Sequence, residues 1–79
     1  MTDKFKEAIL TDLRKLPNNG KGWECLGSFI IDVILENDLS NNLSNEEIQE
    51  EIGKAITFLV KDGLIEIIWI DLELGIKLA

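Results

Sequence analysis

Carboxylates are the most abundant side chains in this sequence that could carry chemistry, and they gather in its middle third. Residues 24–53 hold eight acidic residues and no basic one, within a chain of 79 residues whose net charge is −7. Glu46 is followed directly by Glu47, and Glu50 by Glu51. Clustered carboxylates of this kind are candidates for a metal site, for acid–base catalysis or for an acidic docking surface.

The other residue types argue against the first two uses. The sequence has no histidine and a single cysteine, Cys25, so it lacks both a histidine base and the ligand set of a zinc site. The acidic pairs also lack the alternating oxygen ligands around a glycine that a calcium loop requires. Cys25 follows Glu24, whose charge disfavours a reactive thiolate. We therefore expect no enzyme, no metal and no cofactor, and we expect Cys25 to be a small buried side chain.

An acidic docking surface is the interpretation that remains. The ordinary role of acidic pairs in the first turns of a helix is a solvated face, because the helix dipole favours carboxylates there. If this surface binds a partner, that partner is a protein, either basic or itself nucleic-acid-binding, and the acidic face would imitate a phosphate backbone. The residues expected to make such contacts are Asp32, Glu36, Glu46, Glu47, Glu50 and Glu51.

The length of the chain predicts a single small domain over residues 1–79. Such a domain has a marginal apolar core, and one cysteine cannot form an internal disulfide to support it. Residues 1–16 do not resemble a signal peptide, and the apolar runs fall far short of the roughly 20 residues that cross a bilayer. We expect a cytoplasmic protein with no membrane partner.

The first two elements are predicted as helices. Apolar residues recur at helical spacing over about 3–16, where Pro17 ends the pattern. The spacing of Trp23, Leu26 and Ile30 predicts a second helix over about 24–37. Residues 29–35 are also rich in β-branched side chains, so a buried strand remains an alternative there.

The third helix carries clear signals at both ends. Ser44 and Glu47 have the spacing of a capping box, and Gly63 stands where a left-handed C-terminal cap is expected. These positions predict a helix over about 45–62.

An antiparallel hairpin is predicted after Gly63, with strands over about 64–70 and 72–78 and a turn near Asp71. The first strand is apolar at every position except Glu66, so both of its faces need cover. A small domain with one hairpin covers only one face, so we expect the other to be an apolar patch at which two copies associate. The residues expected there are Ile65, Ile67, Trp69, Leu74 and Ile76.

Residues 44–78 resemble the end of a winged helix-turn-helix domain. The segment LVKDGLI, residues 59–65, is close to the pattern L-x-x-x-G-L-I, at which the recognition helix of that superfamily runs into a two-stranded wing. The resemblance implies an α+β fold of three helices followed by a C-terminal antiparallel β-hairpin. Many members of the superfamily bind DNA through the exposed face of that helix, and others bind proteins.

DNA binding through the third helix fits this sequence poorly. Affinity for nucleic acid depends on Lys and Arg neutralising phosphates, whereas only Lys54 and Lys61 lie near the expected face. We therefore expect a small acidic protein–protein interaction module: an adaptor, a regulator or an inhibitor. The alternative is a dimeric transcriptional regulator that binds DNA, and a third possibility is an accessory subunit. The face that would have to read DNA consists of Glu46, Gln49, Glu50, Gly53 and Thr57.

Overall fold

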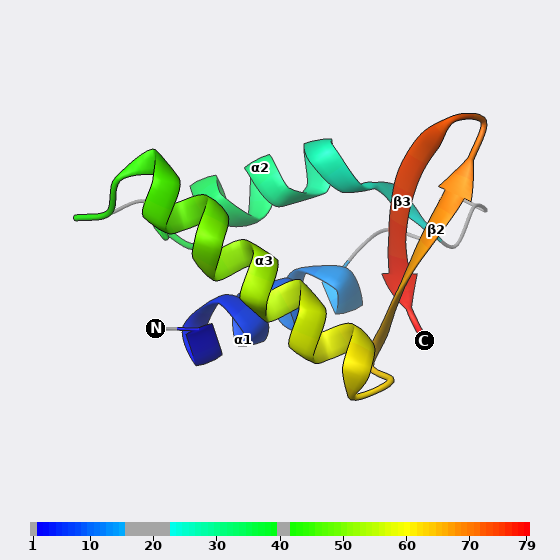
Figure 1. The fold of residues 1–79 in the computed structure, drawn as a ribbon, viewed down its shortest axis with the longest axis horizontal. Helices are drawn as coiled ribbons and strands as arrows, with labels where there is room; N and C mark the ends of the chain where they lie inside the picture. The colour runs from blue at the N-terminus through cyan, green and yellow to red at the C-terminus, as the bar shows by residue number, and fades with distance from the viewer. Residues whose placement is uncertain (1, 16–22, 40–41) are drawn as a thin grey trace.

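The computed structural model describes residues 2–15, 23–39 and 42–79. Three helices are followed by a C-terminal antiparallel hairpin, which confirms the predicted α+β fold (Figure 1). The layout is compatible with a winged-helix-like scaffold. In chain order the elements are α1 (Thr2–Lys15), β1 (Glu24–Cys25), α2 (Leu26–Glu36), α3 (Asn45–Lys61), β2 (Ile65–Ile70) and β3 (Glu73–Leu78).

The sheet contains one strand more than the sequence predicts. Its order is β1-β3-β2, and the short β1 pairs with β3 by placing Glu24 opposite Ile76 and Cys25 opposite Gly75. The helix expected from residue 24 therefore begins at Leu26. A two-residue strand leaves no periodic pattern in a sequence, because its partner alone defines it.

The ambiguous segment 29–35 is helical. Phe29 and Val33 lie one turn apart on α2 and are both buried in the core, so the helical spacing decided the structure over the β-branched composition. Residues 16–22, which include the end predicted for the first helix and the loop after it, lie outside the described residues.

Both ends of α3 have the predicted caps. The Glu47 backbone N–H donates to the Ser44 hydroxyl at 3.2 Å, and the Ser44 N–H donates to the Glu47 carboxylate at 3.2 Å. Gly63 has a φ of 75°, and the Leu64 N–H donates to the Leu59 carbonyl at 3.0 Å. This pair of features is the Schellman arrangement. It turns the chain directly from α3 into β2.

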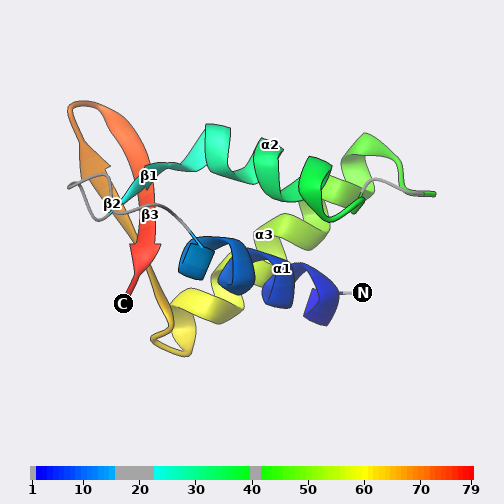
Figure 2. The same ribbon diagram turned by 180° about the vertical axis from the view of Figure 1, so that it is seen from behind.

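The core forms where α1 contacts α2, α3 and β3 (Figure 2). The charged side chain of Asp12 is buried with it, and the Asn37 side-chain amide donates to the Asp12 carboxylate at 3.1 Å. The same amide nitrogen donates to the Val33 carbonyl at 2.9 Å, which ties α1 to the end of α2. The buried apolar residues are Phe5, Ala8, Ile9, Leu10, Leu13, Phe29, Val33, Leu39, Ile48, Ala55, Leu59, Ile65 and Ile76. Across the described ranges, no helix has the length and apolar character needed to span a membrane.

Candidate functional site

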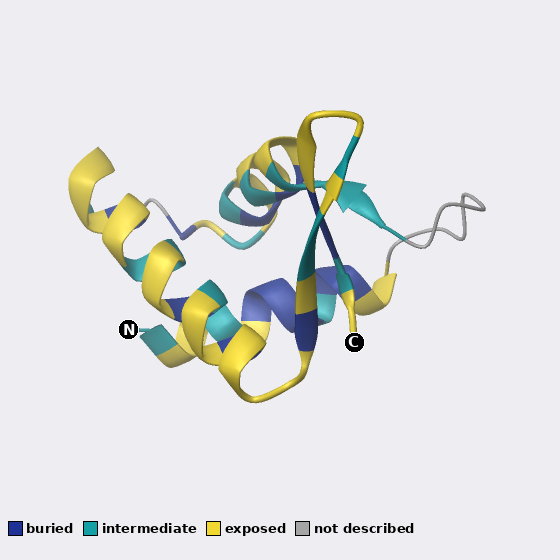
Figure 3. Cartoon of the chain, turned by 45° about the vertical axis from the view of Figure 1, so that its right-hand side comes forward, coloured by how far each residue is buried: buried dark blue, intermediate teal, exposed yellow. Residues whose placement is uncertain are grey.

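The β2–β3 hairpin projects beyond the helices, so its two ends differ in burial (Figure 3). Alternation along the strands puts Ile65, Ile67 and Trp69 of β2 on one face with Leu74 and Ile76 of β3. Near the helices, Ile65 and Ile76 are 1% and 0% exposed. At the tip, Trp69 is 72% exposed, and Leu74 is also exposed.

These positions correct part of the predicted self-association surface. Ile65 and Ile76 are core residues whose side chains offer no area to a second copy, and Ile67 is half-buried. Only Trp69 and Leu74 of the predicted set have exposed side chains. The alternation was right, but the reach of the helices along the hairpin decides which residues of that face are covered.

The opposite face of the hairpin is partly covered by Trp23. A Cβ built on Gly75 would lie 2.8 Å from Cε3 of Trp23 and 3.3 Å from Cγ1 of Ile68. The indole therefore rests on the glycine, beside Ile68. On the same face Glu66 and Lys77, directly opposite each other, form an ion pair at 3.6 Å. Trp23 thus covers part of the face opposite to the predicted self-association residues, whereas the face of those residues is covered by the core at its base.

The turn of the hairpin holds an exposed leucine in a strained backbone conformation. Asp71 and Leu72 have φ values of 49° and 68°, which is typical of a two-residue type I′ turn. Such turns favour asparagine, aspartate and glycine, because positive φ is energetically unfavourable for other residues. Leu72 is nevertheless 94% exposed. A strained, solvated leucine at a loop tip is a candidate contact residue.

An apolar groove of about 610 Å³ lies between the tip of the hairpin, α2 and α3. Leu26 and Ile30 line it from successive turns of α2, and Ile52 and Ile56 do the same on α3. Cys25 also lines the groove and is half-buried, so the prediction that it is a buried residue is corrected. The groove is lined by Cys25, Leu26, Gly27, Ile30, Ile52, Ile56, Trp69, Leu72, Glu73 and Leu74.

Most of the predicted acidic residues are exposed near one end of the molecule. Asp32 and Glu36 are exposed on α2, and Glu46, Glu47 and Glu50 are exposed on α3. The C-terminal end of α2 and the N-terminal end of α3 lie on the same side, away from the hairpin (Figure 1). Glu47 combines exposure with its role in the capping box.

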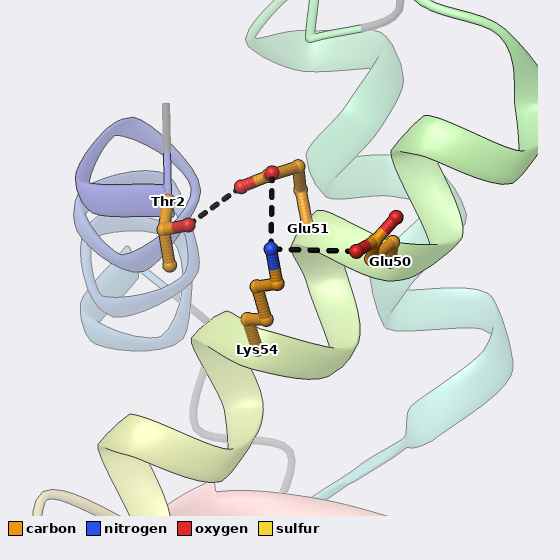
Figure 4. A network of polar contacts seen from close by, with 4 residues as sticks. All are labelled: Thr2, Glu50, Glu51 and Lys54. Atoms are coloured by element: carbon orange, nitrogen blue, oxygen red, sulfur yellow. Dashed lines mark hydrogen bonds and ion pairs between the residues drawn. The ribbon is translucent and has the colours of Figure 1, made fainter.

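Glu51 differs from the other glutamates because it bonds within the protein (Figure 4). The Thr2 hydroxyl donates to Oε2 of Glu51 at 2.6 Å, joining the first turn of α1 to α3. Nζ of Lys54 lies 3.9 Å from Oε1 of Glu51 and 3.4 Å from Oε1 of Glu50. The Glu51 side chain is only 16% exposed, so it holds two helices together and has little surface for a partner.

The last turn of α2 is acidic where the helix dipole favours cations. It contains no basic residue, and Glu36 is its final residue. A carboxylate there faces the negative end of the dipole. We expect Glu36→Lys to raise the free energy of unfolding by about 0.3–1 kcal/mol, measured by urea titration followed by circular dichroism. Glu36→Gln should give a smaller gain, and a loss of stability in both variants would contradict the dipole argument.

The outer face of α3 has a shallow depression of about 330 Å³ around Gly53. The Thr57 hydroxyl donates to the Gly53 carbonyl at 2.8 Å, and a Cβ on Gly53 would meet nothing within 4 Å. We expect Gly53→Ala to stabilise the protein by about 0.5–1 kcal/mol, since alanine loses less backbone entropy in a helix. Thermal unfolding measures this gain. Equal or lower stability would show that the helix is strained at this residue.

The groove was not predicted from the sequence. Ile52 and Ile56 lie one turn apart on α3, the spacing of a core-facing stripe, but they pack only partly against the core. The available signal was Leu72, a large apolar residue directly after the turn residue Asp71. Periodicity in the sequence shows which side of each helix is apolar. How much of that side is covered depends on the separation of the two helices, which periodicity does not show.

Comparison with protein family models, with curated proteins and with solved structures finds no match to this chain.

Proposed function

We propose that this protein is a small acidic protein–protein interaction module on a winged-helix-like scaffold, and that it acts as an adaptor, regulator or inhibitor. Its ligand is an amphipathic helix with basic flanks, presented by a partner protein. The observation that carries the proposal is the apolar groove, with Trp69 72% and Leu72 94% exposed at its edge. Contiguous exposed apolar surface of this kind marks interaction sites in soluble proteins.

The shape of the groove supports a helical ligand. Leu26 and Ile30 form one ridge and Ile52 and Ile56 a second, each with the one-turn spacing that a third helix can pack against. Helix-in-groove recognition uses anchors at this same spacing. Trp69 at the third wall supplies the large rigid side chain that often dominates binding energy.

The charge of the two helices that line the groove supports a basic ligand. The stretch from residue 24 to residue 53, which includes α2 and the first half of α3, has acidic residues and no basic ones. Glu36 lies at the end of α2 where the helix dipole disfavours a carboxylate, so it lowers the stability of the helix. Residues that lower stability in this way often serve function. Complementary charge steers association and selects the partner.

DNA recognition through α3 is disfavoured by the same charges. Its outer face carries Glu46, Gln49 and Glu50, and Lys54 on this helix is ion-paired with Glu50. Lys77 of the hairpin is likewise ion-paired with Glu66. Phosphates would have to displace these carboxylates before either lysine could contact them.

A fluorescein-labelled amphipathic helix built from Lys and Leu tests the proposal by fluorescence anisotropy. We expect micromolar binding that weakens as salt rises, because the attraction is partly ionic. A Glu/Leu helix with the same spacing, and a scrambled Lys/Leu peptide with no apolar face, should bind at least about tenfold more weakly. Equal binding of all three peptides would contradict the proposal.

Two aromatic residues provide a matched control for that experiment. Trp69 lines the groove, whereas Phe58 is 46% exposed on α3 outside it. Trp69→Ala should weaken binding of the Lys/Leu peptide about tenfold or more, and Phe58→Ala should leave the Kd of that peptide within about twofold. Tight binding of a labelled DNA duplex at low salt, with no response to the peptide, would favour the alternative of a DNA-binding regulator.

A further inference from the structure

Strand β2 lies at the rim of the sheet and lacks the features that usually protect such an edge. The strand order β1-β3-β2 leaves one side of β2 without a partner strand among the described residues. Natural edge strands are blocked by proline, by bulges, by lysine or by inward charges. β2 reads IEIIWI and pairs with β3 without interruption from Ile65 to Ile70, so it has no bulge. Its one charge, on Glu66, is ion-paired with Lys77 of β3.

The hairpin geometry determines which backbone groups of β2 point outward. A two-residue type I′ turn is closed by a hydrogen-bonded pair, here Ile70 and Glu73. Hydrogen-bonded and non-bonded pairs then alternate along an antiparallel ladder. Residues 66, 68 and 70 therefore direct their N–H and C=O groups to β3. Ile65, Ile67 and Trp69 direct theirs to the free edge.

We propose that a second copy of this chain pairs its own β2 antiparallel against this edge, with a two-fold axis at Ile67. In this register Ile67 faces Ile67 of the other copy, and Ile65 faces Trp69. All three outward residues then exchange backbone hydrogen bonds across the interface. The two sheets become one continuous sheet, held together by these backbone hydrogen bonds. The geometry makes the edge self-complementary, which is why the occupant is a second copy.

The neighbouring registers are worse for identifiable reasons. Residues that lie opposite each other in an antiparallel pair point to the same face of the sheet. The two-fold axis must therefore pass through a residue that faces its own copy, and the register changes only when the axis moves to the next residue. Centring on Glu66 would place two carboxylates directly opposite, which destabilises the pair. Centring on Ile68 would set Ile65 against Asp71 of the turn, where the left-handed backbone ends the strand. The Ile67 register alone uses the whole edge.

Charge sets the conditions under which pairing occurs. Each copy carries a net charge of −7, so two copies repel each other at low ionic strength. Edge pairing covers a small area compared with the interfaces of permanent dimers, and we expect a Kd in the micromolar range or weaker. Added salt should strengthen this dimer, whereas it should weaken the groove-bound basic peptide. The two proposals can therefore fail independently.

Sedimentation equilibrium of the full chain tests for the dimer over about 5–500 µM protein, at low and at high salt. We expect a monomer–dimer equilibrium that shifts at least about threefold toward dimer in high salt. A monomer at every concentration and salt level overturns the proposal.

Trp69→Pro removes one outward N–H of β2 while leaving the hydrogen bonds to β3, and it should abolish the dimer. Trp69→Leu keeps that N–H and should retain it. A dimer that persists in a folded Trp69→Pro protein overturns edge pairing.

Disulfide trapping tests the register without relying on the proline variant. In a Cys25→Ser background, Ile67→Cys places two thiols opposite each other, at a Cα separation of about 5.5 Å that a disulfide can bridge. Ile68→Cys faces Glu66 of the other copy instead. Oxidised glutathione should convert the Ile67→Cys protein to covalent dimer at least about tenfold faster than the Ile68→Cys protein. Equal rates, or faster trapping at residue 68, would overturn the register.

Discussion

Replacing Gly75 with alanine is expected to destabilise the protein by about 1–3 kcal/mol, because the added methyl group has no space. A Cβ at this position would approach the Trp23 ring to 2.8 Å, which is closer than real contacts allow. Gly75 also lies opposite both Cys25 and Ile68, so a shift there disturbs both strand pairings of β3. In a domain of this size such a loss lowers the unfolding midpoint by about 4–8 °C per kcal/mol.

Gly53→Ala is the matched control, since the same chemical change at an open helical site should raise the midpoint. Scanning calorimetry on both variants makes the comparison. The double variant Trp23→Leu with Gly75→Ala should recover part of the loss, because the smaller side chain removes the clash. If Gly75→Ala is as stable as the parent protein, Trp23 does not rest on the hairpin as described.

Leu72→Gly is expected to raise stability and to weaken binding at the same time. Glycine relieves the left-handed strain at residue 72 and completes an Asp-Gly turn, for a net gain of up to about 1 kcal/mol after its own entropy cost. The same change removes an exposed side chain from the groove, so the Lys/Leu peptide should bind about tenfold more weakly. Chemical denaturation and anisotropy measure the two effects.

Alanine variants separate strain from contact in that prediction. Leu72→Ala keeps the positive φ at residue 72 and loses the side-chain contact with the peptide. It should therefore weaken binding of the Lys/Leu peptide without raising the stability of the protein. Leu35→Ala removes a leucine that is 73% exposed on α2 but does not line the groove, and its peptide affinity should be unchanged. If Leu72→Gly binds the peptide as tightly as the parent protein, the turn is not part of the interaction surface.

Local chemistry made the helices and the hairpin predictable. The capping box at Ser44 and the glycine cap at Gly63 each depend on a few neighbouring residues, and both were found where expected. The alternation that put Trp69 on one face with Leu74 was also local. In contrast, β1 exists only because residues 24–25 meet β3, which is far away in sequence.

Long-range geometry decided the parts of the site that were not predicted. Ile65 and Ile76 have the same character as Trp69 and Leu74, yet the first pair is buried and the second exposed, since the helices cover only the base of the hairpin. Glu51 could not be distinguished from Glu50 by composition. Its bond to Thr2 depends on how α1 crosses α3.

The position of β3 in the sheet has a consequence for how the chain folds as it is synthesised. β3 separates β1 from β2, so neither of those strands has a partner until residues 73–78 have emerged from the ribosome. Until then the apolar segment IEIIWI is an unpaired strand, prone to aggregation in a nascent chain. The helices can form early, whereas the sheet closes in a late step that joins residues some fifty positions apart.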